Sequence, residues 1–365
     1  MSTLEQPRAV HRTARTLVAV AAVATLALTL LVAAPAEARK RTRGHVTWGD
    51  SSLTSSKYGY AIEGKVSGGK GRTVSLQVES ADGWHVIDRA RTQSRGRFVI
   101  KGQLNWLGSH ALRVKVPATR TFNERTFGPR KFTVKRTWRA RGEASAHGFL
   151  TDNEQGMRFS LNPCSTIHYR VNPVKAGRKA IPFTKEAVRR IGAATGFTFK
   201  YVGRTRKVPF RDGGFDYPRG TDMVVAWSHQ RRDPFLEGAV GVGGFQGGHL
   251  AERRASGERL WQTHRPGVTM NMKYQSDYPW KFSSEANEPI GLVLIHELGH
   301  AMGLAHYPDN IQIMHPGDRS ARDSRWSALW EAGDLAGLRK NGAQPGCMTL
   351  VRGRGALSAP GQMLD

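Results

Sequence analysis

The sequence predicts a chain of two parts with different fold classes, an all-β sandwich over residues 45–137 and a mixed α+β part over residues 146–350. With 365 residues the chain is long enough for two domains, each with its own hydrophobic core. A composition of 39% hydrophobic and 23% charged residues is typical of globular proteins and excludes wholesale disorder. The two parts differ in pattern, because short alternating runs broken by turn residues come first and helix-periodic runs come only afterwards.

Residues 1–38 have the layout of a secretory signal peptide. A basic start precedes an uncharged, mostly apolar run over residues 17–34, and Ala36-Glu37-Ala38 supplies the small-x-small cleavage pattern. A transmembrane anchor is the alternative, since a run of about 18 apolar residues begins to span a bilayer. The cleavage pattern directly after the run favours the signal peptide. We therefore expect a secreted, extracellular protein with no membrane anchor after cleavage.

The segment 45–137 contains short runs in which apolar and polar residues partly alternate, which predicts β-strands. The runs cover residues 58–66, 73–80, 84–90, 96–101 and 111–116. Gly, Asp and Ser separate them at short intervals, and Ala81-Asp82-Gly83 is a hairpin turn signal. Regular short strands with such turns predict a sandwich. The segment resembles the immunoglobulin-like modules that often precede secreted bacterial enzymes.

The charge of the chain is strongly positive and unevenly distributed. The formal net charge is +26, and residues 39–140 alone hold 22 Lys+Arg against 6 Asp+Glu, a surplus of 16. Such a surplus attracts polyanions such as anionic cell-wall polymers, nucleic acid or acidic lipid. A solvated, arginine-rich surface is the alternative interpretation. Because the chain carries no recognisable nucleic-acid-binding motif, we expect no nucleic-acid partner.

Residues 138–145 are polar and basic without periodicity and are predicted to be a linker, and residues 351–365 a flexible tail. Between them the strands are predicted over residues 166–171, 197–202, 222–227 and 268–272, and the helices over residues 185–195, 290–304 and 326–339. Glycines crowd residues 238–248, which is typical of a segment that another backbone approaches closely. Its first part, residues 238–244, is either an edge strand that pairs with extended substrate or a mobile surface loop.

Two cysteines, Cys164 and Cys347, enclose most of the second part. In an oxidising compartment we expect them to form a disulfide. A disulfide that closes a loop of that length lowers the conformational entropy of the unfolded chain. In the chain-entropy treatment this stabilises the folded protein by about 5 kcal/mol. Two separate buried thiols are the alternative.

The residues that predict chemistry lie at the end of the apolar helix over residues 290–304, in the sequence His296-Glu297-Leu298-Gly299-His300-Ala301-Met302-Gly303-Leu304-Ala305-His306. Two histidines four residues apart project from one helix face and can share one metal ion. Gly303 can adopt the left-handed conformation that ends a helix, after which the chain can bring His306 to the same ion. Three neutral imidazoles leave one tetrahedral position of a zinc ion open, which distinguishes a catalytic site from a closed structural site.

The same motif supplies a general base. Glu297 neighbours His296, and its carboxylate can reach a water at the open position without being a ligand. Zinc lowers the pKa of bound water and polarises a carbonyl oxygen. The expected reaction is therefore amide hydrolysis, in which Glu297 takes a proton from the attacking water and passes it to the leaving amine.

The extended motif followed by a Met-turn is the signature of the metzincins, and the chain resembles that clan of zincin peptidases. Met314 lies eight residues after His306 and is similar to the Met-turn residue that forms the floor under the metal. Within the clan the chain is most similar to the matrixins, the matrix metalloproteinase family and its bacterial relatives. The resemblance implies a metzincin-like α+β catalytic domain. Asp334 matches the first position of the matrixin Asp-x-x-Gly pattern, which implies support of the Met-turn, although a solvated helix carboxylate is the alternative.

Several positions depart from the matrixin pattern. Gly333 and Tyr307 stand where matrixins usually have an acidic residue and a serine. The chain has no Pro-Arg-Cys-Gly segment, so latency through a propeptide cysteine is not expected. It also has no His-x-Asp segment of the kind that binds the structural ions of the family. We therefore expect one catalytic zinc ion and no structural second zinc, and calcium is left open.

These observations predict a secreted zinc-dependent endopeptidase, expected as a monomer, with protein or peptide substrates and a basic N-terminal module that could hold anionic cell-wall polymer. One alternative is a zinc amidase that acts on cell-wall peptides, which the basic module motivates. Another is a surface-binding protein with an incidental enzyme domain. A decayed site would be expected to have lost Glu297 or one of the three histidines, and all four are present.

Overall fold

The computed structural model describes residues 38–152, 154–211, 215–274, 279–282, 290–317 and 328–351, together with the backbone of residues 356–357. The predicted signal peptide lies outside the described residues except for Ala38. Within the described ranges, no helix is long and apolar enough to cross a bilayer.

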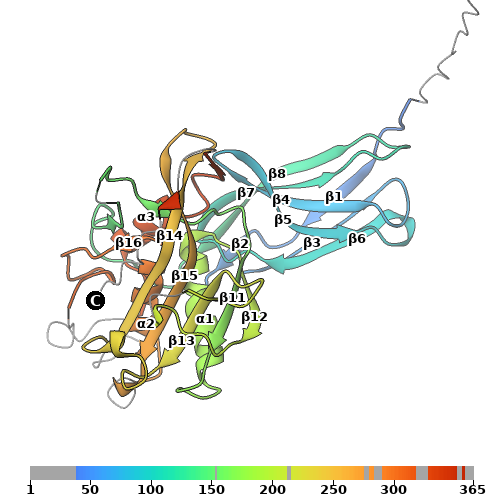
Figure 1. Ribbon diagram of the computed structural model, residues 1–365. Helices are drawn as coiled ribbons and strands as arrows, with labels where there is room; N and C mark the ends of the chain where they lie inside the picture. Colours follow the sequence, from blue (N-terminus) through green and yellow to red (C-terminus); the bar gives the residue numbers. More distant parts are fainter. Residues whose placement is uncertain are drawn as a thin grey trace, which may run out of the picture. The chain divides into compact units, whose positions relative to one another are not determined.

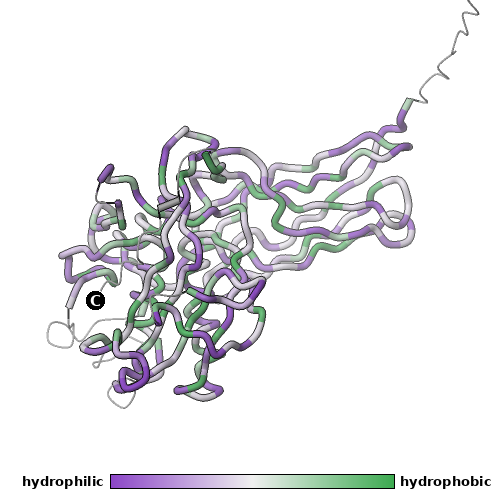
Figure 2. The backbone as a smooth tube through the Cα atoms, viewed as in Figure 1, coloured by the Kyte–Doolittle hydropathy of each residue, from purple (hydrophilic) through white to green (hydrophobic). Residues whose placement is uncertain are grey.

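Residues 44–135 fold into two β-sheets, drawn in blue to green in Figure 1. One sheet has the order β1-β3-β6 and the other the order β2-β8-β7-β4-β5. The strands are β1 (Gly44–Trp48), β2 (Ser52–Thr54), β3 (Gly59–Val66), β4 (Thr73–Ser80), β5 (Gly83–Arg91), β6 (Arg97–Gln103), β7 (Gly108–Val116) and β8 (Arg125–Lys135). Hydrophilic and hydrophobic positions alternate along them (Figure 2), and the apolar positions form one core that includes Ile62, Leu76, Phe98 and Phe132.

The five strands that the sequence predicts in this part are all present, with ends that differ by three residues at most. The Ala81-Asp82-Gly83 segment forms the predicted hairpin turn between β4 and β5. Strands β1, β2 and β8 were not predicted, because polar and basic residues interrupt their alternation.

Residues 146–351 form a mixed α+β structure with few helices. Its sheet follows the order β12-β11-β13-β15-β14-β17, with β10 paired to β15 and β18 paired to β14. Strands β12, β11, β13 and β15 run parallel, and β14 is antiparallel to β15. The strands of this sheet are β10 (Phe159–Ser160), β11 (Ile167–Asn172), β12 (Phe199–Arg204), β13 (Met223–Ser228), β14 (Gly241–Arg253), β15 (Arg259–Asn271), β17 (Met348–Leu350) and β18 (Ala356–Leu357). Strands β9 (Gly148–Phe149) and β16 (Leu304–Ala305) pair separately.

Three α-helices accompany this sheet in the described residues: α1 (Ala180–Thr195), α2 (Ile290–Ala301) and α3 (Ala332–Asn341). Short 3-10 turns cover Pro234–Leu236 and Met272–Tyr274. The apolar faces of the helices share one core with the sheet, around Ile191, Trp227 and Ile295. All three predicted helices are confirmed with shifted ends. Helix α2 ends at Ala301 because the chain turns at Gly303, whose φ of 91° lies in the left-handed region.

The β14–β15 hairpin is longer than the sequence predicts. Both strands have 13 residues, whereas a strand was expected over residues 268–272 and, as one of two interpretations, in the glycine-rich segment. The surface-loop interpretation of the glycine-rich segment is wrong from Gly241 onward, because this segment is the first half of β14. Glycine has no side chain to pack in a strand, so the alternation that identifies strands is absent there.

Cys164 and Cys347 form the predicted disulfide, with their Cα atoms 5.4 Å apart. The prediction of a flexible tail from residue 351 is corrected at three positions. Val351 donates its backbone N–H to Leu250, and the strand Ala356–Leu357 pairs with β14. The edge of β14 leaves backbone groups available there, and the tail satisfies them. The other residues of the predicted tail lie outside the described residues.

The predicted linker over residues 138–145 is anchored to the α+β part. The Trp138 indole N–H donates to the carbonyl of Trp330 at 3.0 Å, and the carbonyl of Arg141 accepts the backbone N–H of Ala332 at 2.9 Å. The backbone N–H of Leu107 also donates to the carbonyl of Ala193 in α1. The described residues from Lys40 onward accordingly belong to one compact unit.

Candidate metal centre

Three imidazoles meet at the C-terminal end of α2. His296 and His300 lie one helical turn apart on α2, and His306 directly follows β16. The Nε2 atom of His300 lies 3.1 Å from the Nε2 atoms of both other rings, and those two atoms lie 3.2 Å apart. Gly303 makes the intervening turn, and a Cβ atom there would lie 2.4 Å from the carbonyl oxygen of Phe159. The structure therefore brings together the three histidines that the motif singles out.

Backbone carbonyls fix the orientation of two of the rings. The Nδ1 atom of His296 lies 2.6 Å from the carbonyl oxygen of Ile313, and that of His300 lies 2.8 Å from the carbonyl oxygen of Leu304. A carbonyl only accepts, so each Nδ1 carries the proton and each neutral ring has its lone pair on Nε2. Burial, followed by the nearby His306, lowers the pKa of His300 to about 3, so this ring is neutral at neutral pH.

The convergence of these nitrogens fits a zinc ion. Two Nε2 lone pairs that face each other cannot hydrogen-bond, whereas a cation between them satisfies both. Zinc–nitrogen bonds of about 2.0–2.1 Å in a tetrahedral site place the ligand nitrogens about 3.3 Å apart. The observed separations of 3.1–3.2 Å are close to this value. A donor set of three neutral imidazoles is one that catalytic zinc sites use.

Glu297 lies against the glycine-rich half of β14. Its side chain is buried, and its Oε2 atom has almost no contact with solvent. A Cβ atom on Gly241 would lie 2.9 Å from its Cγ, and one on Gly243 would lie 2.1 Å from its carbonyl oxygen. The glycines therefore allow β14 to approach α2 at this residue. This close approach is the one that the glycine-rich segment predicts.

Met314 packs directly under α2. Its side chain is buried, and a Cβ atom on Gly299 would lie 2.4 Å from its sulfur. Gly299 lies between the two helical histidines in sequence, so the thioether packs against the turn of α2 that carries them. The carbonyl of Met314 also accepts the backbone N–H of Tyr307, at 2.8 Å, which ties the turn to the segment that carries His306.

Asp334 on α3 binds the backbone of the turn that contains Ile313 and Met314. Its carboxylate accepts the backbone N–H groups of Ile313 at 2.8 Å, Met314 at 3.2 Å and Glu331 at 3.1 Å. The side chain is buried, which corrects the alternative of a solvated helix carboxylate. Since the Ile313 carbonyl orients His296, Asp334 is connected to the metal centre through one backbone unit.

Two supporting residues were not found from the sequence. Gln312 accepts the backbone N–H groups of Gly333 and Asp334 at 2.9 and 3.1 Å. Glu331 is buried and accepts two hydrogen bonds from the guanidinium of Arg141, at 3.1 and 3.0 Å. An acidic side chain at position 333 would not fit, because a Cβ atom there would lie 2.0 Å from the carbonyl oxygen of Ala146. The hydrogen bonds of Gln312 to Gly333 and of Glu331 to Arg141 join segments that are distant in the chain, so the sequence around either residue does not indicate them.

Comparisons with known proteins agree with this centre. The matrixin family model matches residues 246–339, which include all three histidines, Glu297, Met314 and Asp334. The chain is 32% identical over 116 residues to human matrix metalloproteinase-15, an alignment that covers 30% of this chain and 15% of that protein. It is 33% identical over 103 residues to rat matrix metalloproteinase-16, which covers 27% of this chain and 14% of that protein.

The chain thus spans about one seventh of the length of the curated relatives it matches. Among solved structures, a Ruminococcus gnavus β-glucuronidase aligns with this chain at 10% sequence identity, and the alignment covers 47% of this chain and 29% of that chain. Its TM-score of 0.17 is too low to indicate a shared fold. Over residues 246–339 the chain is similar to the matrixins.

Proposed function

We propose that the protein is a secreted zinc-dependent endopeptidase. The observation that carries the proposal is the convergence of His296, His300 and His306 within 3.2 Å beside the buried Glu297. The three Nε2 atoms would hold one zinc ion. A zinc ion at this position supplies Lewis-acid polarisation of a peptide carbonyl and activation of water.

The remaining chemistry belongs to the residues of the chain. Glu297 acts as the general base: it accepts a proton from the attacking water and delivers it to the nitrogen of the leaving amine. The contact between α2 and the glycines of β14 sets the position of this carboxylate. Met314 forms the floor under the histidines, and Asp334 keeps that floor and the Ile313 carbonyl in place.

The substrate is proposed to bind along β14. Residues Gly241–Gln246 pair with β15 on one side, whereas β17 and β18 pair with the other side only at residues 248–249 and 251–253. Among the described strands, the other edge of residues 241–246 therefore has no partner. An extended peptide added to this edge would be held by backbone hydrogen bonds next to Glu297.

The test is substitution of the proposed base. Glu297→Ala is expected to keep one equivalent of zinc and to lower peptide hydrolysis on the order of 10²–10⁴-fold. Glu252→Ala, which removes an exposed glutamate at the far end of β14, is the matched control and should hydrolyse peptides at the rate of the unsubstituted protein. Hydrolysis by Glu297→Ala at the control rate would rule out the proposed mechanism.

The N-terminal part is proposed to be an immunoglobulin-like module that retains the enzyme on anionic cell-wall polymer. Its support is the surplus of 16 positive charges over residues 39–140. The alternative substrate, the peptide bonds of the wall itself, rests on the same charge. Digestion of a denatured protein and of purified cell wall side by side separates the two substrates, and release of fragments from the wall alone would favour the amidase.

A further inference from the structure

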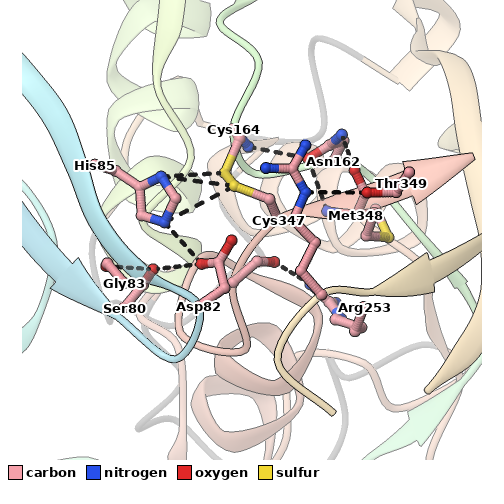
Figure 3. Close-up of a disulfide and its surroundings, with 12 residues drawn as sticks. Ser80, Asp82, Gly83, His85, Asn162, Cys164, Arg253, Cys347, Met348 and Thr349 are labelled. Carbon is pink, nitrogen blue, oxygen red and sulfur yellow. Dashed lines mark hydrogen bonds and ion pairs between the residues drawn. A yellow bond between two sulfur atoms is a disulfide. The ribbon is translucent and has the colours of Figure 1, made fainter. Parts of the chain in front are cut away.

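A second group of metal-ligating side chains lies where the β4–β5 hairpin meets the disulfide (Figure 3). Asp82 and His85 come from the hairpin, Cys164 precedes β11, and Cys347 precedes β17. One potential ligand atom of each residue lies within 4.8 Å of the others. The group does not include any residue of α2, so it is separate from the proposed catalytic centre.

The imidazole of His85 lies between the disulfide and the carboxylate of Asp82, and its Nε2 atom is itself 3.8 Å from the sulfur of Cys347. Its Nδ1 atom lies 3.7 Å from the sulfur of Cys164 and 3.6 Å from the sulfur of Cys347. Its Nε2 atom lies 2.7 Å from Oδ1 of Asp82. A carboxylate only accepts, so Nε2 carries the proton, and in the neutral ring Nδ1 is the nitrogen that keeps a lone pair, within 3.7 Å of both sulfurs.

Hydrogen bonds hold Asp82 in this position. Its side chain is only 4% exposed, and the hydroxyl of Ser80 donates to it at 2.9 Å. The carboxylate therefore fixes both the tautomer and the direction of the His85 ring.

This arrangement is the one found around zinc in proteins. A ligating histidine almost always donates its other ring N–H to a carboxylate or carbonyl, which orients the ring and raises its basicity. Thiolate sulfur and imidazole nitrogen are the ligands that zinc prefers. The two sulfurs are unavailable as thiolates while they are bonded to each other.

We propose that the Cys164–Cys347 disulfide is the oxidised form of a second zinc site, in which both sulfurs and Nδ1 of His85 bind Zn²⁺ and Asp82 positions His85. A dithiol reductant supplies the two electrons and two protons. Its thiolate attacks the exposed Cys164, the bond to Cys347 breaks, and the reductant closes to its own disulfide and releases two protein thiols. Zn²⁺ then displaces both thiol protons.

Access to the site is open from one side. Cys164 is exposed, and the His85 side chain is 29% exposed. Both residues line a cavity of about 680 Å³ between the hairpin and the segment that begins β12. A reductant and a metal ion can therefore reach the sulfurs without unfolding of the surrounding strands. Coordination by His85 would replace a non-bonded contact by a metal bond between the N-terminal strands and the peptidase part.

The experiment uses the full chain and Co²⁺ as a spectroscopic probe. The disulfide is reduced with a water-soluble phosphine, which takes up oxygen from water, forms the phosphine oxide and leaves two thiols without contributing a thiolate of its own. Thiolate-to-cobalt charge-transfer absorption reports sulfur ligation and cannot arise from the imidazoles of α2. The reduced protein is expected to develop this band as Co²⁺ is added up to two equivalents, one for each proposed site, and to lose it when Zn²⁺ displaces the cobalt. The oxidised protein should give no band.

Variants separate a metal site from a packing contact. His85→Ala is expected to weaken Co²⁺ binding at this site by 10-fold or more, and Asp82→Asn on the order of 10-fold. His45→Ala removes an exposed histidine of β1 and is the matched control, with unchanged affinity. Circular dichroism of the same samples follows the fold. Absence of the band in the reduced protein, whether folded or unfolded, or equal affinity of His85→Ala and the control, would overturn the proposal. Peptide hydrolysis does not enter this readout, so its outcome leaves the proposed enzyme untouched.

Discussion

A Cβ atom placed on Gly243 would lie 2.1 Å from the carbonyl oxygen of Glu297, so β14 and α2 meet backbone to backbone at the glutamate of the motif. Real side chains do not come this close, and the atom in the way belongs to the backbone of a buried helix. The glycine-rich sequence of β14 is thus a requirement of the metal centre, because it sets how near the proposed substrate edge lies to the proposed base.

Gly243→Ala should therefore damage both stability and activity. Forcing a methyl group into this contact is expected to cost about 1–3 kcal/mol of unfolding free energy and to lower peptide hydrolysis, because β14 must move away from Glu297. Urea unfolding and a peptide assay measure the two effects. The matched control is Gly59→Ala in β3, where the nearest atom to the new Cβ would be 3.9 Å away. Identical behaviour of the two variants would contradict this account of the glycines.

Asp334→Asn should weaken zinc binding without changing a ligand. The buried carboxylate accepts three backbone N–H groups, and an amide can accept with only one of its two polar atoms. We expect a loss of about 1–3 kcal/mol in stability and a decrease in zinc affinity on the order of 10–100-fold, measured by competition with a chelator. Asp216→Asn, at a side chain that is 82% exposed, is the control. If the zinc affinity of Asp334→Asn equals that of the control, Asp334 does not support the metal centre.

Stability should depend on pH through Asp233, which lies before β14. Burial raises the pKa of this carboxyl, but hydrogen bonds from Arg211 and Ser228 outweigh it and hold the pKa below its ordinary value. A depressed carboxyl pKa contributes stability above the pKa of the unfolded chain, about 3.9, and this contribution is lost as the pH falls through the folded pKa. The stability difference between the unsubstituted protein and Asp233→Asn should therefore narrow between about pH 7 and about pH 2 in urea unfolding. A constant difference across that range would show that the charge of Asp233 does not stabilise the fold.

The metal centre was the easiest part to predict from the sequence, because its geometry is local. His300 lies four positions after His296 on one helix. The turn at Gly303 then brings His306 close to both. Helical periodicity and one left-handed glycine therefore determine most of the site. The short strands of residues 58–116 were also predictable, since alternation and turn residues identify them one at a time.

The features that escaped prediction depend on contacts between distant segments. Arg141 and Glu331 meet across 190 residues of sequence, and nothing in either neighbourhood indicates the other. His85 lies beside Cys347, which is 262 residues away in the sequence, so this contact could not be predicted for the same reason. The first half of β14 could not be distinguished from a surface loop, because the glycines that allow the close helix contact remove the alternation by which strands are identified.

The most direct test of the account is a zinc titration of the metal-free protein, followed by peptide hydrolysis. Chelation should abolish hydrolysis, and added zinc should restore it to a plateau at one equivalent in the protein with its disulfide intact. His300→Ala, which removes the most buried of the three rings, should show no such restoration at that equivalence. Hydrolysis that persists after complete removal of metal, or that returns equally in His300→Ala, would contradict the claim that these three imidazoles hold the catalytic ion.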